Sequence, residues 1–563
     1  MTVATAGREL TAPPARRRHP LMTATVVALA AAAMLPVVTL ALVALGGSDD
    51  MWPHLATNVL PGAIQTTATL IVLVTTGTAI LGITTAWLIV GFDFPFRRTL
   101  SWALVLPLAV PPYLAAYAFA EFFLFTGPVQ TALRAIFGFQ TPRDYWFPDL
   151  RSTGGAAFVL ASVLYPYVYL TCRVVFLMQG RGIGDVARTL GAGPLRVFLR
   201  VLLPAARPAV AAGVVLVLME TINDIGVAEY LGVRTLTSAI YTTWINRGSL
   251  EGAAQIAMVM LLVVLALLAG ERYARRLQRF HNARATQLKA RRPRIRIGGL
   301  AAIAATVWVA FPVLLGFGVP IWVFGRYAAR RMDSLFNADL GAAFLNSVMT
   351  GTITAVLSVL IAMFLVYATR VVRASGLRPL VMVASSGYAL PGTILGLGLL
   401  FALARFDNAL DGVMRANFGV STGLLLTGSL AAVVIACTIR FLALAEGALR
   451  SGLEKLPPSL DEAARSLGHT PFASARLVIL PLMRPALLTA LVLVFVDTTK
   501  ELSATILLRP FGFNTLATLV YENASRAVVE DGALAALLII ATATVPVMLL
   551  SRALSDDRDA SAS

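Results

Sequence analysis

Charged and amide side chains occur inside two apolar stretches of the chain, at matched positions. Glu220, Asn223 and Asp224 lie in the first stretch, and Asp497, Lys500 and Glu501 lie in the second at a constant offset of 277 in the numbering. Because residues three and four apart share a helix face, each set predicts one polar face. An ionisable side chain inside a membrane is costly and usually faces a polar interior. The two faces predict the lining or gate of a translocation path; the alternative is structural pairing of Lys500 with Asp497 or Glu501.

A short polar segment is repeated upstream of each polar face. Residues 185–191 and 462–468 share one pattern, and each copy is followed at the same distance by Leu-Pro and then Arg-Pro. In the second copy, Ser459 and Glu462 have the spacing of a capping box, and Gly468 can close the helix in the left-handed conformation. Residues 471–480 predict a second helix that Pro481 stops. We call these helix–turn–helix units, residues 185–204 and 459–481, the two elbows.

Two matched elbows predict two equivalent docking surfaces for a cytoplasmic partner with two-fold symmetry. The residues assigned to them are Asp185, Ala187, Gly191 and Pro204 in the first elbow, and Glu462, Ala463, Ala464, Gly468 and Pro481 in the second. The alternative is an ordinary amphipathic helix at the membrane surface. A rigid elbow can transmit a push from its partner into the helix that follows.

The composition is that of an integral membrane protein. The chain has 563 residues, of which 58% are hydrophobic and 13% charged, whereas soluble domains carry about 25% charged residues. Its net charge of +17 comes from short basic segments between apolar runs. This is the positive-inside pattern, which we favour over nucleic-acid binding. The two cysteines, Cys172 and Cys437, lie in apolar runs and are predicted to be buried and unpaired.

Twelve apolar runs are long enough to cross a bilayer. They lie near residues 21–46, 60–90, 99–124, 154–178, 209–231 and 252–270, and near 297–324, 345–369, 378–405, 421–445, 486–508 and 532–551. The arginine-rich linker 272–296 places the loops on either side of the membrane, so that both termini and both elbows are predicted to be cytoplasmic. Arg326, Arg330 and Arg331 run against this rule, because they fall on the outer side.

The runs form two sets of six, and further segments repeat between the sets. Residues 234–241 resemble residues 514–521 at an offset of 280, and residues 109–112 resemble residues 389–392. Two parallel repeats imply a pseudo-two-fold axis along the membrane normal. We predict a cytoplasmic tail (1–20), a first transmembrane domain (21–271), a basic cytoplasmic linker (272–296), a second transmembrane domain (297–553) and a cytoplasmic tail (554–563).

No catalytic motif is found. A phosphate-binding loop needs Gly-x-x-x-x-Gly-Lys, and none of the three lysines follows a glycine. We therefore expect no enzyme activity, no cofactor and no resident metal. Glu229, Tyr230, Tyr241, Trp244 and Tyr521 are expected near the outer rim, where tyrosine is more often part of the aromatic belt than a ligand.

The second elbow resembles the cytoplasmic loop of permease subunits of binding-protein-dependent ABC importers, through Glu462, Ala463, Ala464, Gly468 and Pro481. The first elbow departs mildly, with Asp185 and Val186 in the places of Glu and Ala. In that family the loop supplies the coupling helix that docks on an ATPase subunit. The resemblance implies an all-α membrane protein with about 12 helices in two pseudo-symmetric halves, the type I importer fold.

The segments around the polar faces, residues 218–226 and 495–511, look like those of ferric-iron ABC permeases. The resemblance covers residues from about 50 to 553. It implies a bacterial inner-membrane permease that works with two ATP-binding subunits, a periplasmic or surface-tethered binding protein and membrane lipid, without nucleic acid. Permeases for thiamine and polyamines share the architecture and remain alternatives for the cargo. A secondary ion-coupled transporter is the alternative from another class.

Overall fold

The computed structural model describes residues 20–48, 51–179, 193–276, 294–371, 377–457 and 459–556. Within these residues, ten helices are long and apolar enough to cross a membrane, and the number is twelve if each of two bent helix pairs counts as one span. The prediction of an all-α protein with about 12 membrane helices is confirmed.

The two halves contain corresponding helices in the same order. The first half comprises α1 (Pro20–Leu45), α2 (Met51–His54), α3 (Leu60–Gly91), α4 (Arg97–Ala103), α5 (Pro112–Phe123), α6 (Pro128–Phe137), α7 (Thr153–Gln179), α9 (Pro194–Val197), α10 (Leu203–Asn223), α11 (Gly226–Tyr230), α12 (Leu236–Ile245) and α13 (Leu250–Arg276). The second comprises α14 (Gly299–Val313), α15 (Val319–Arg330), α16 (Ala338–Val371), α17 (Leu377–Ala384), α18 (Gly392–Phe418), α19 (Leu430–Glu454), α20 (Ser459–Ser466), α21 (Pro471–Ser474), α22 (Leu480–Leu482), α23 (Arg484–Thr499), α24 (Thr505–Leu508), α25 (Leu516–Ser525) and α26 (Ala533–Asp556).

The internal repeat extends to single hydrogen bonds. Helices α12 and α25 begin at equivalent positions, and each follows a threonine, Thr235 or Thr515, whose hydroxyl caps the first turn. The next backbone N–H of each helix donates to a hydroxyl in its own half: Leu236 to Thr67 at 3.0 Å, and Leu516 to Ser347 at 2.7 Å. Side chains repeated in sequence therefore repeat the same local structure.

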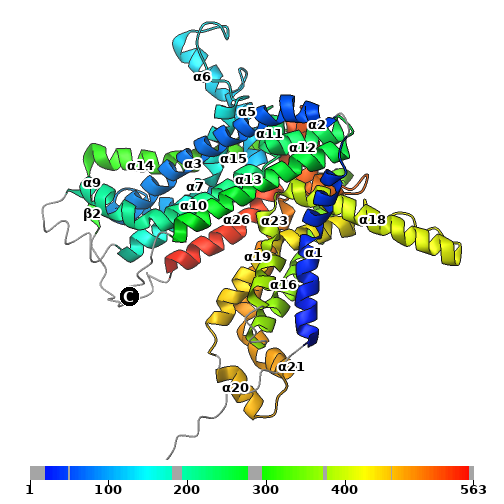
Figure 1. Cartoon of the computed structure of the whole chain (residues 1–563). Coiled ribbons are helices and arrows are strands. Elements are labelled where there is room, and N and C mark those ends of the chain that lie inside the picture. Colours follow the sequence, from blue (N-terminus) through cyan, green and yellow to red (C-terminus); the bar gives the residue numbers. More distant parts are fainter. Residues whose placement is uncertain are drawn as a thin grey trace, which may run out of the picture.

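The two halves exchange helices at their edges (Figure 1). Helix α1 packs against α17 and α18 of the second half, and α15 packs against α5 of the first. One hydrophobic core combines α3, α5 and α7 with α14, α15 and α26, and the other combines α16, α18, α19 and α23 with α1 and α13. Two glycines permit these crossings. A Cβ at Gly398 would lie 2.3 Å from the carbonyl oxygen of Pro36, and one at Gly316 would lie 2.2 Å from that of Ser162.

A short parallel bridge ties the start of the second half to the first. Strand β1 (Phe92–Asp93) pairs with β2 (Ile295–Arg296), directly before α14. The N–H of Ile297 adds a bond of 3.2 Å to the carbonyl of Asp93. This bridge fixes where α14 enters the bundle of the first half.

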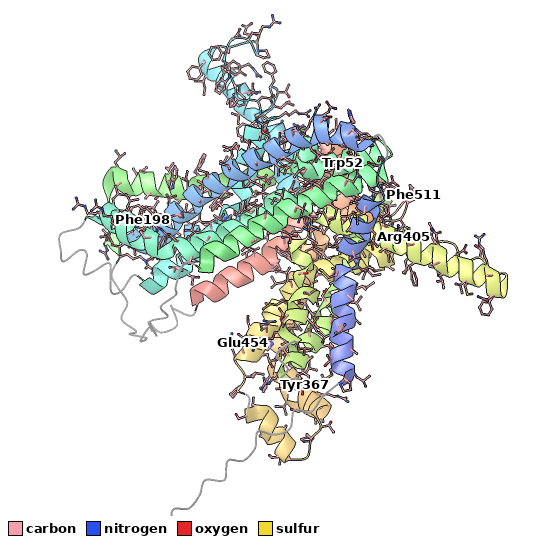
Figure 2. All side chains as sticks on the ribbon, viewed as in Figure 1. Trp52, Phe198, Tyr367, Arg405, Glu454 and Phe511 are labelled. Atoms are coloured by element: carbon pink, nitrogen blue, oxygen red, sulfur yellow. The ribbon has the colours of Figure 1, made fainter. Side chains whose placement is uncertain are left out.

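The helix bundles meet at one end of the molecule and diverge at the other. We call the end that carries the elbows the elbow end, and the end that carries loops 124–152, 231–249, 419–429 and 509–532 the outer end. In Figure 1 the bundles diverge toward α9 on one side and α20 on the other. Figure 2 places Trp52 and Phe511 at the outer end, and Tyr367 and Glu454 toward the second elbow. Arg331, one of the basic residues that run against the positive-inside rule, pairs with Asp531 at 3.3 Å and so lies with the outer loops.

Prolines follow every π-helical turn in the described part of the chain. Turns at Leu55–Val59, Phe198–Leu202, Leu314–Gly318 and Ala475–Ile479 each end two residues before a proline. Because proline lacks an N–H and clashes with the carbonyl four residues earlier, a wider turn accommodates it without ending the helix. The stop expected at Pro204, the equivalent of Pro481, is therefore absent, whereas the helix at Pro481 ends one residue later, before a bend of 61°. One helix runs through Pro204 to Asn223, and the other continues past Pro481 to Leu482.

Four predicted spans are interrupted. The runs 99–124, 209–231, 378–405 and 486–508 were each expected to form one helix, but α5, α11, α18 and α24 each begin after a non-helical break. The breaks at Pro111 and Pro391 are equivalent, since each follows a 3-10 turn, Leu106–Ala109 or Ser386–Ala389. Irregular backbone at membrane depth is tolerated where it is buried in protein or lines a polar cavity.

Candidate functional site

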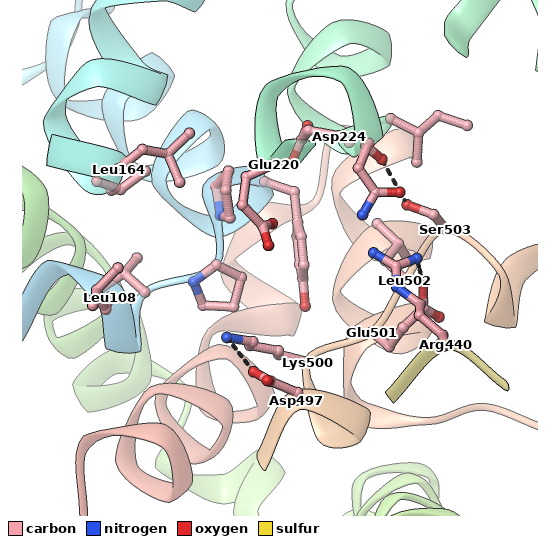
Figure 3. Close-up of a pocket in the computed structure, with 18 of the residues that line it drawn as sticks. Leu108, Leu164, Glu220, Asp224, Arg440, Asp497, Lys500, Glu501, Leu502 and Ser503 are labelled. Carbon is pink, nitrogen blue, oxygen red and sulfur yellow. Dashed lines mark hydrogen bonds and ion pairs between the residues drawn. The ribbon is translucent and has the colours of Figure 1, made fainter. Parts of the chain in front are cut away.

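The four breaks meet at one cavity between the halves, which we call the central cavity. Its volume is about 90 Å³, and all six residues predicted for the translocation path line it: Glu220, Asn223, Asp224, Asp497, Lys500 and Glu501. Figure 3 shows Glu220 above the Lys500–Asp497 pair, with Glu501 and Arg440 beside it. The structure thus brings both polar faces to one place, and their role in a path stays a prediction.

Three hydrogen bonds cross the central cavity from one half to the other. The hydroxyl of Tyr388 donates to Glu220 at 3.0 Å. The N–H of Gly392 donates to the side-chain oxygen of Asn223 at 2.6 Å, and the Ser503 hydroxyl donates to the Asn223 carbonyl at 3.2 Å. These bonds hold the two halves together where the backbone of each half leaves its helix.

Asp224 and Glu501 each accept backbone N–H groups of the short helix that follows them, one in each half. Asp224 accepts the N–H of Val227 at 2.6 Å, and Glu501 accepts the N–H groups of Ala504 and Thr505, both at 3.0 Å. Each carboxylate thereby caps the short helix after the break. The prediction that Asp224 shares a helix face with Glu220 and Asn223 is wrong, because α10 ends at Asn223 and the backbone of Asp224 is extended.

The predicted structural pairing is also present. The Lys500 ammonium lies 2.6 Å from Asp497, one turn earlier on the same chain segment. Glu501 pairs instead with Arg440 of α19 at 3.0 Å, in an ion pair whose side chains are 9% and 2% exposed. The sequence signal for Arg440 was a lone charge inside the apolar run 421–445, and it was missed. The equivalent position in the first half, at the offset of 277, is Val163, so the first half has no counterpart.

Tyrosines on the central cavity were also missed. Tyr113, Tyr167 and Tyr388 line it together with the six predicted residues. Tyr113 is 3% exposed, and its hydroxyl has no hydrogen-bond partner in the described part of the chain. A tyrosine inside an apolar run does not predict a polar contact, because hydropathy does not indicate where its hydroxyl points.

The charge of the central cavity is unbalanced. Its lining contains four carboxylates, from Glu220, Asp224, Asp497 and Glu501, and two basic groups, from Lys500 and Arg440, so the formal charge of the lining is two negative. Such a cavity favours a cation over an anion. The described residues contain no group of three histidine, cysteine, aspartate or glutamate side chains placed to hold a metal ion.

The second elbow has the predicted turn. Helix α20 contains Glu462, Ala463 and Ala464 and ends at Ser466. Gly468 has φ +82°, which confirms the left-handed conformation. After it, α21 leads through a π-helical turn to α22, which bends by 61° into α23. In the first elbow, Asp185, Ala187 and Gly191 lie outside the described residues, and Pro204 stands at the start of α10.

Each elbow is connected to the central cavity by one helix. The helix after the first elbow ends at Asn223, beside Glu220. The helix after the second ends at Thr499, between Asp497 and Lys500. A displacement of an elbow therefore has a direct route to the polar residues between the halves.

Residues 78–279 and 376–558 both match the family model described as "Binding-protein-dependent transport system inner membrane component". One match falls in each half, and together they cover more than half of the chain. Helix α1 and helices α14 to α16 lie outside the two matches.

Several curated relatives are permeases. The Fe(3+)-transport system permease protein FbpB 2 of Haemophilus influenzae is 23% identical over 491 residues, which cover 87% of this chain and 89% of the relative. The putative ferric transport system permease protein FbpB 1 of the same organism is 24% identical over 72% of this chain and 63% of the relative. The molybdenum transport system permease protein ModB of Escherichia coli is 30% identical over 34% of this chain and 82% of its own length. The chain belongs to the family of inner-membrane components of binding-protein-dependent transport systems, and it is a multi-pass membrane permease with two copies of the family's domain in one polypeptide.

Proposed function

We propose that this chain is the transmembrane subunit of an ATP-driven ABC importer that carries ferric iron delivered by a binding protein. Two relatives named as ferric permeases support the cargo, but the molybdenum permease shows that similar proteins serve other cargoes. The observation that favours ferric iron over an anionic cargo is the charge of the central cavity, whose lining has a formal charge of two negative. A negative cavity attracts a cation and repels an oxyanion.

The chemistry of the central cavity favours a small hard ion over an organic cation. Hard cations prefer oxygen ligands, and the cavity offers carboxylates and tyrosine hydroxyls. Thiamine and polyamines, which lack this preference, are the weaker alternatives. The family depends on a binding protein, which argues against a secondary ion-coupled transporter.

ATP is hydrolysed in this account by two separate subunits that dock on the elbows. The chain has no phosphate-binding loop. The elbow ends of the two halves lie apart in Figure 1, whereas the halves contact each other around the central cavity. Closure of the ATPase dimer would draw the elbows together and move α10 and α23, whose ends carry the polar residues. The bonds of Glu220 and Asn223 to the second half would then break and re-form as the gate.

The proposed orientation follows from the basic segments. Both termini, the linker and both elbows lie in the cytoplasm, and the outer end faces the binding protein, in the inner membrane of a bacterium. The residues assigned to the path are Glu220, Asn223, Asp224, Asp497, Lys500 and Glu501. The predicted domain boundaries, 21–271 and 297–553, are kept as the two permease domains.

Variants at the central cavity test the proposal. In a strain without another ferric importer, Glu220→Gln and Asp224→Asn should reduce ferric uptake by about tenfold or more, equivalent to about 1.4 kcal/mol. The matched control is Glu251→Gln, an exposed acid at the start of α13 that does not line the cavity, and it should transport normally. Normal uptake by both cavity variants at matched expression would leave only the structural interpretation. In that case a Lys500→Met, Asp497→Asn double variant would regain what each single change loses.

A further inference from the structure

A second and larger cavity opens at the outer end, and we call it the outer cavity. Its volume is about 860 Å³. The first half contributes α5, the loop 138–152 and α11 to its wall, and the second half contributes α25 and the loop that follows it. The loop 138–152 is held by Asp144, which accepts the N–H groups of Thr141 and Gln140 and the Thr141 hydroxyl. These bonds lower the pKa of Asp144.

The outer cavity has the same charge sign as the central one. Three acids line it, Glu121, Asp149 and Glu229, against one base, Arg151. Asp149 accepts a backbone N–H at 2.8 Å, and Glu121 accepts the hydroxyl of Tyr327 at 2.6 Å. Within the described chain, the carboxylate of Glu229 has neither a hydrogen bond nor an ion pair. It is therefore the acid that is free to hold a cation.

Three tyrosines line the same cavity as Glu229. Tyr117, Tyr230 and Tyr521 line the outer cavity, and the rings of Tyr117 and Tyr230 are 4.4 Å apart. Tyr117 is 1% exposed. Tyr521 interacts through its hydroxyl with Tyr241, its equivalent in the first half, and the charge of Glu229 acts on both. Tyr230 and Tyr521, which were expected near the outer rim, both line this cavity.

Helix α5 separates the two cavities. Tyr113 lines the central cavity, and Tyr117, one turn later on the same helix, lines the outer cavity. Their rings are 5.9 Å apart. Gly226 makes this packing possible, because a Cβ there would lie 2.4 Å from that of Tyr113. These two positions on α5 therefore lie between the linings of the two cavities.

We propose that the outer cavity is the receiving site of the permease for a hard trivalent cation, held by Glu229 and by the hydroxyl oxygens of Tyr117 and Tyr521, with Tyr113 and Tyr117 as the barrier to the central cavity. This site rests on the proposed ferric cargo and adds the place where that cargo first binds. Carboxylate and phenol oxygens suit such an ion by ligand hardness. Two cavities of negative charge in series also give a cation a continuous attractive route.

Terbium binding to the purified full chain in lipid nanodiscs tests the receiving site. Tb³⁺ is a hard trivalent ion whose luminescence is sensitised by nearby tyrosine. We expect wild-type protein to give sensitised emission, Glu229→Gln to weaken the apparent Kd about tenfold or more, and Tyr521→Phe to reduce the emission at saturation. Glu251→Gln, which removes an equal charge outside both cavities, should bind as wild type. Equal affinity in Glu229→Gln and Glu251→Gln would overturn the proposal.

The same variants separate this proposal from the proposed function. If ATP-driven ferric uptake is normal while terbium binds equally well to Glu229→Gln, the receiving site is wrong and the function stands. If Glu229→Gln weakens both terbium binding and the rate of ferric uptake at low concentration, the site is supported. If the wild-type complex transports no ferric iron, the function fails and the receiving site fails with it.

Cysteine accessibility tests the barrier. The two native cysteines are buried, which gives a low background. A Ser503→Cys reporter in the central cavity should resist a membrane-impermeant thiol reagent added from outside, and it should become reactive when Tyr117→Ala is added. The matched control is Phe119→Ala, an equally large truncation on α5 at a buried residue that lines neither cavity. Equal reactivity with Phe119→Ala, or none with Tyr117→Ala, would contradict the barrier.

Discussion

The Arg440–Glu501 pair allows the sharpest prediction about the central cavity. Glu501 accepts four hydrogen bonds, one from Arg440 at 3.0 Å and three from Ala504 and Thr505. Its side chain is 2% exposed, so water does not replace a lost partner. The change Arg440→Met removes the counter-charge and keeps an unbranched apolar stem of similar length in α19.

The magnitude follows from the burial of the pair. Removing one partner of a buried ion pair costs about 3–5 kcal/mol, because an uncompensated charge stays behind. In the double variant Arg440→Met, Glu501→Gln, no net charge is buried, and the amide oxygen of glutamine can still accept the N–H groups of Ala504 and Thr505. We expect a coupling energy of about 2–3 kcal/mol between the two positions.

Unfolding of the purified full chain in mixed micelles by SDS, followed by tryptophan fluorescence, measures these free energies. Arg450→Met is the matched control on the same helix. The Arg450 and Glu446 side chains are 36% and 11% exposed, so the loss of Arg450 should cost less than the loss of Arg440, whose pair is 9% and 2% exposed. If Arg440→Met costs no more than Arg450→Met, or if the two single changes add without coupling, the pair does not stabilise the cavity in the way described.

Three further predictions follow from the exchange of helices, the elbows and the topology. Gly398→Val should destabilise the protein by about 1–3 kcal/mol or more in the same SDS titration, because its Cβ meets the Pro36 carbonyl, whereas Gly412→Val, with open space around it, should be neutral. Gly468→Pro and Glu462→Arg should abolish uptake while immunoblots find the protein in the membrane fraction; uptake at the wild-type rate would contradict docking at the elbow. Reporter fusions after residue 290 and at the C-terminus should be active in the cytoplasm, and labelling of a cysteine at position 290 from outside would reverse the topology.

Local features of the fold could be predicted from the sequence. Residues 234–241 and 514–521, which repeat at an offset of 280, form two matched helices with matched threonine caps. Such caps can be predicted because capping depends on neighbours within a few residues. The left-handed turn at Gly468 was predicted for the same reason. The exchange of α1 and α15 was not, because an apolar face predicts that a helix is covered and does not identify the covering helix.

The breaks at the central cavity were missed because hydropathy stays high across them. The signals were local: Pro111-Pro112 and Pro391-Gly392 stand where α5 and α18 restart, and the residue before a proline disfavours the helix. The partners of the six polar residues required tertiary structure. Arg440 lies 61 residues before Glu501, and nothing in their spacing connects them.

ATP-driven uptake in proteoliposomes that contain the wild-type chain, its ATPase and its binding protein tests whether the chain is a ferric importer. Radioactive ferric iron and radioactive molybdate are supplied in parallel, each with ATP or with a non-hydrolysable analogue. We expect ferric iron to accumulate only with ATP and binding protein, and molybdate not to accumulate. Accumulation of molybdate, or ferric uptake that is equal with the analogue, would contradict the proposed function.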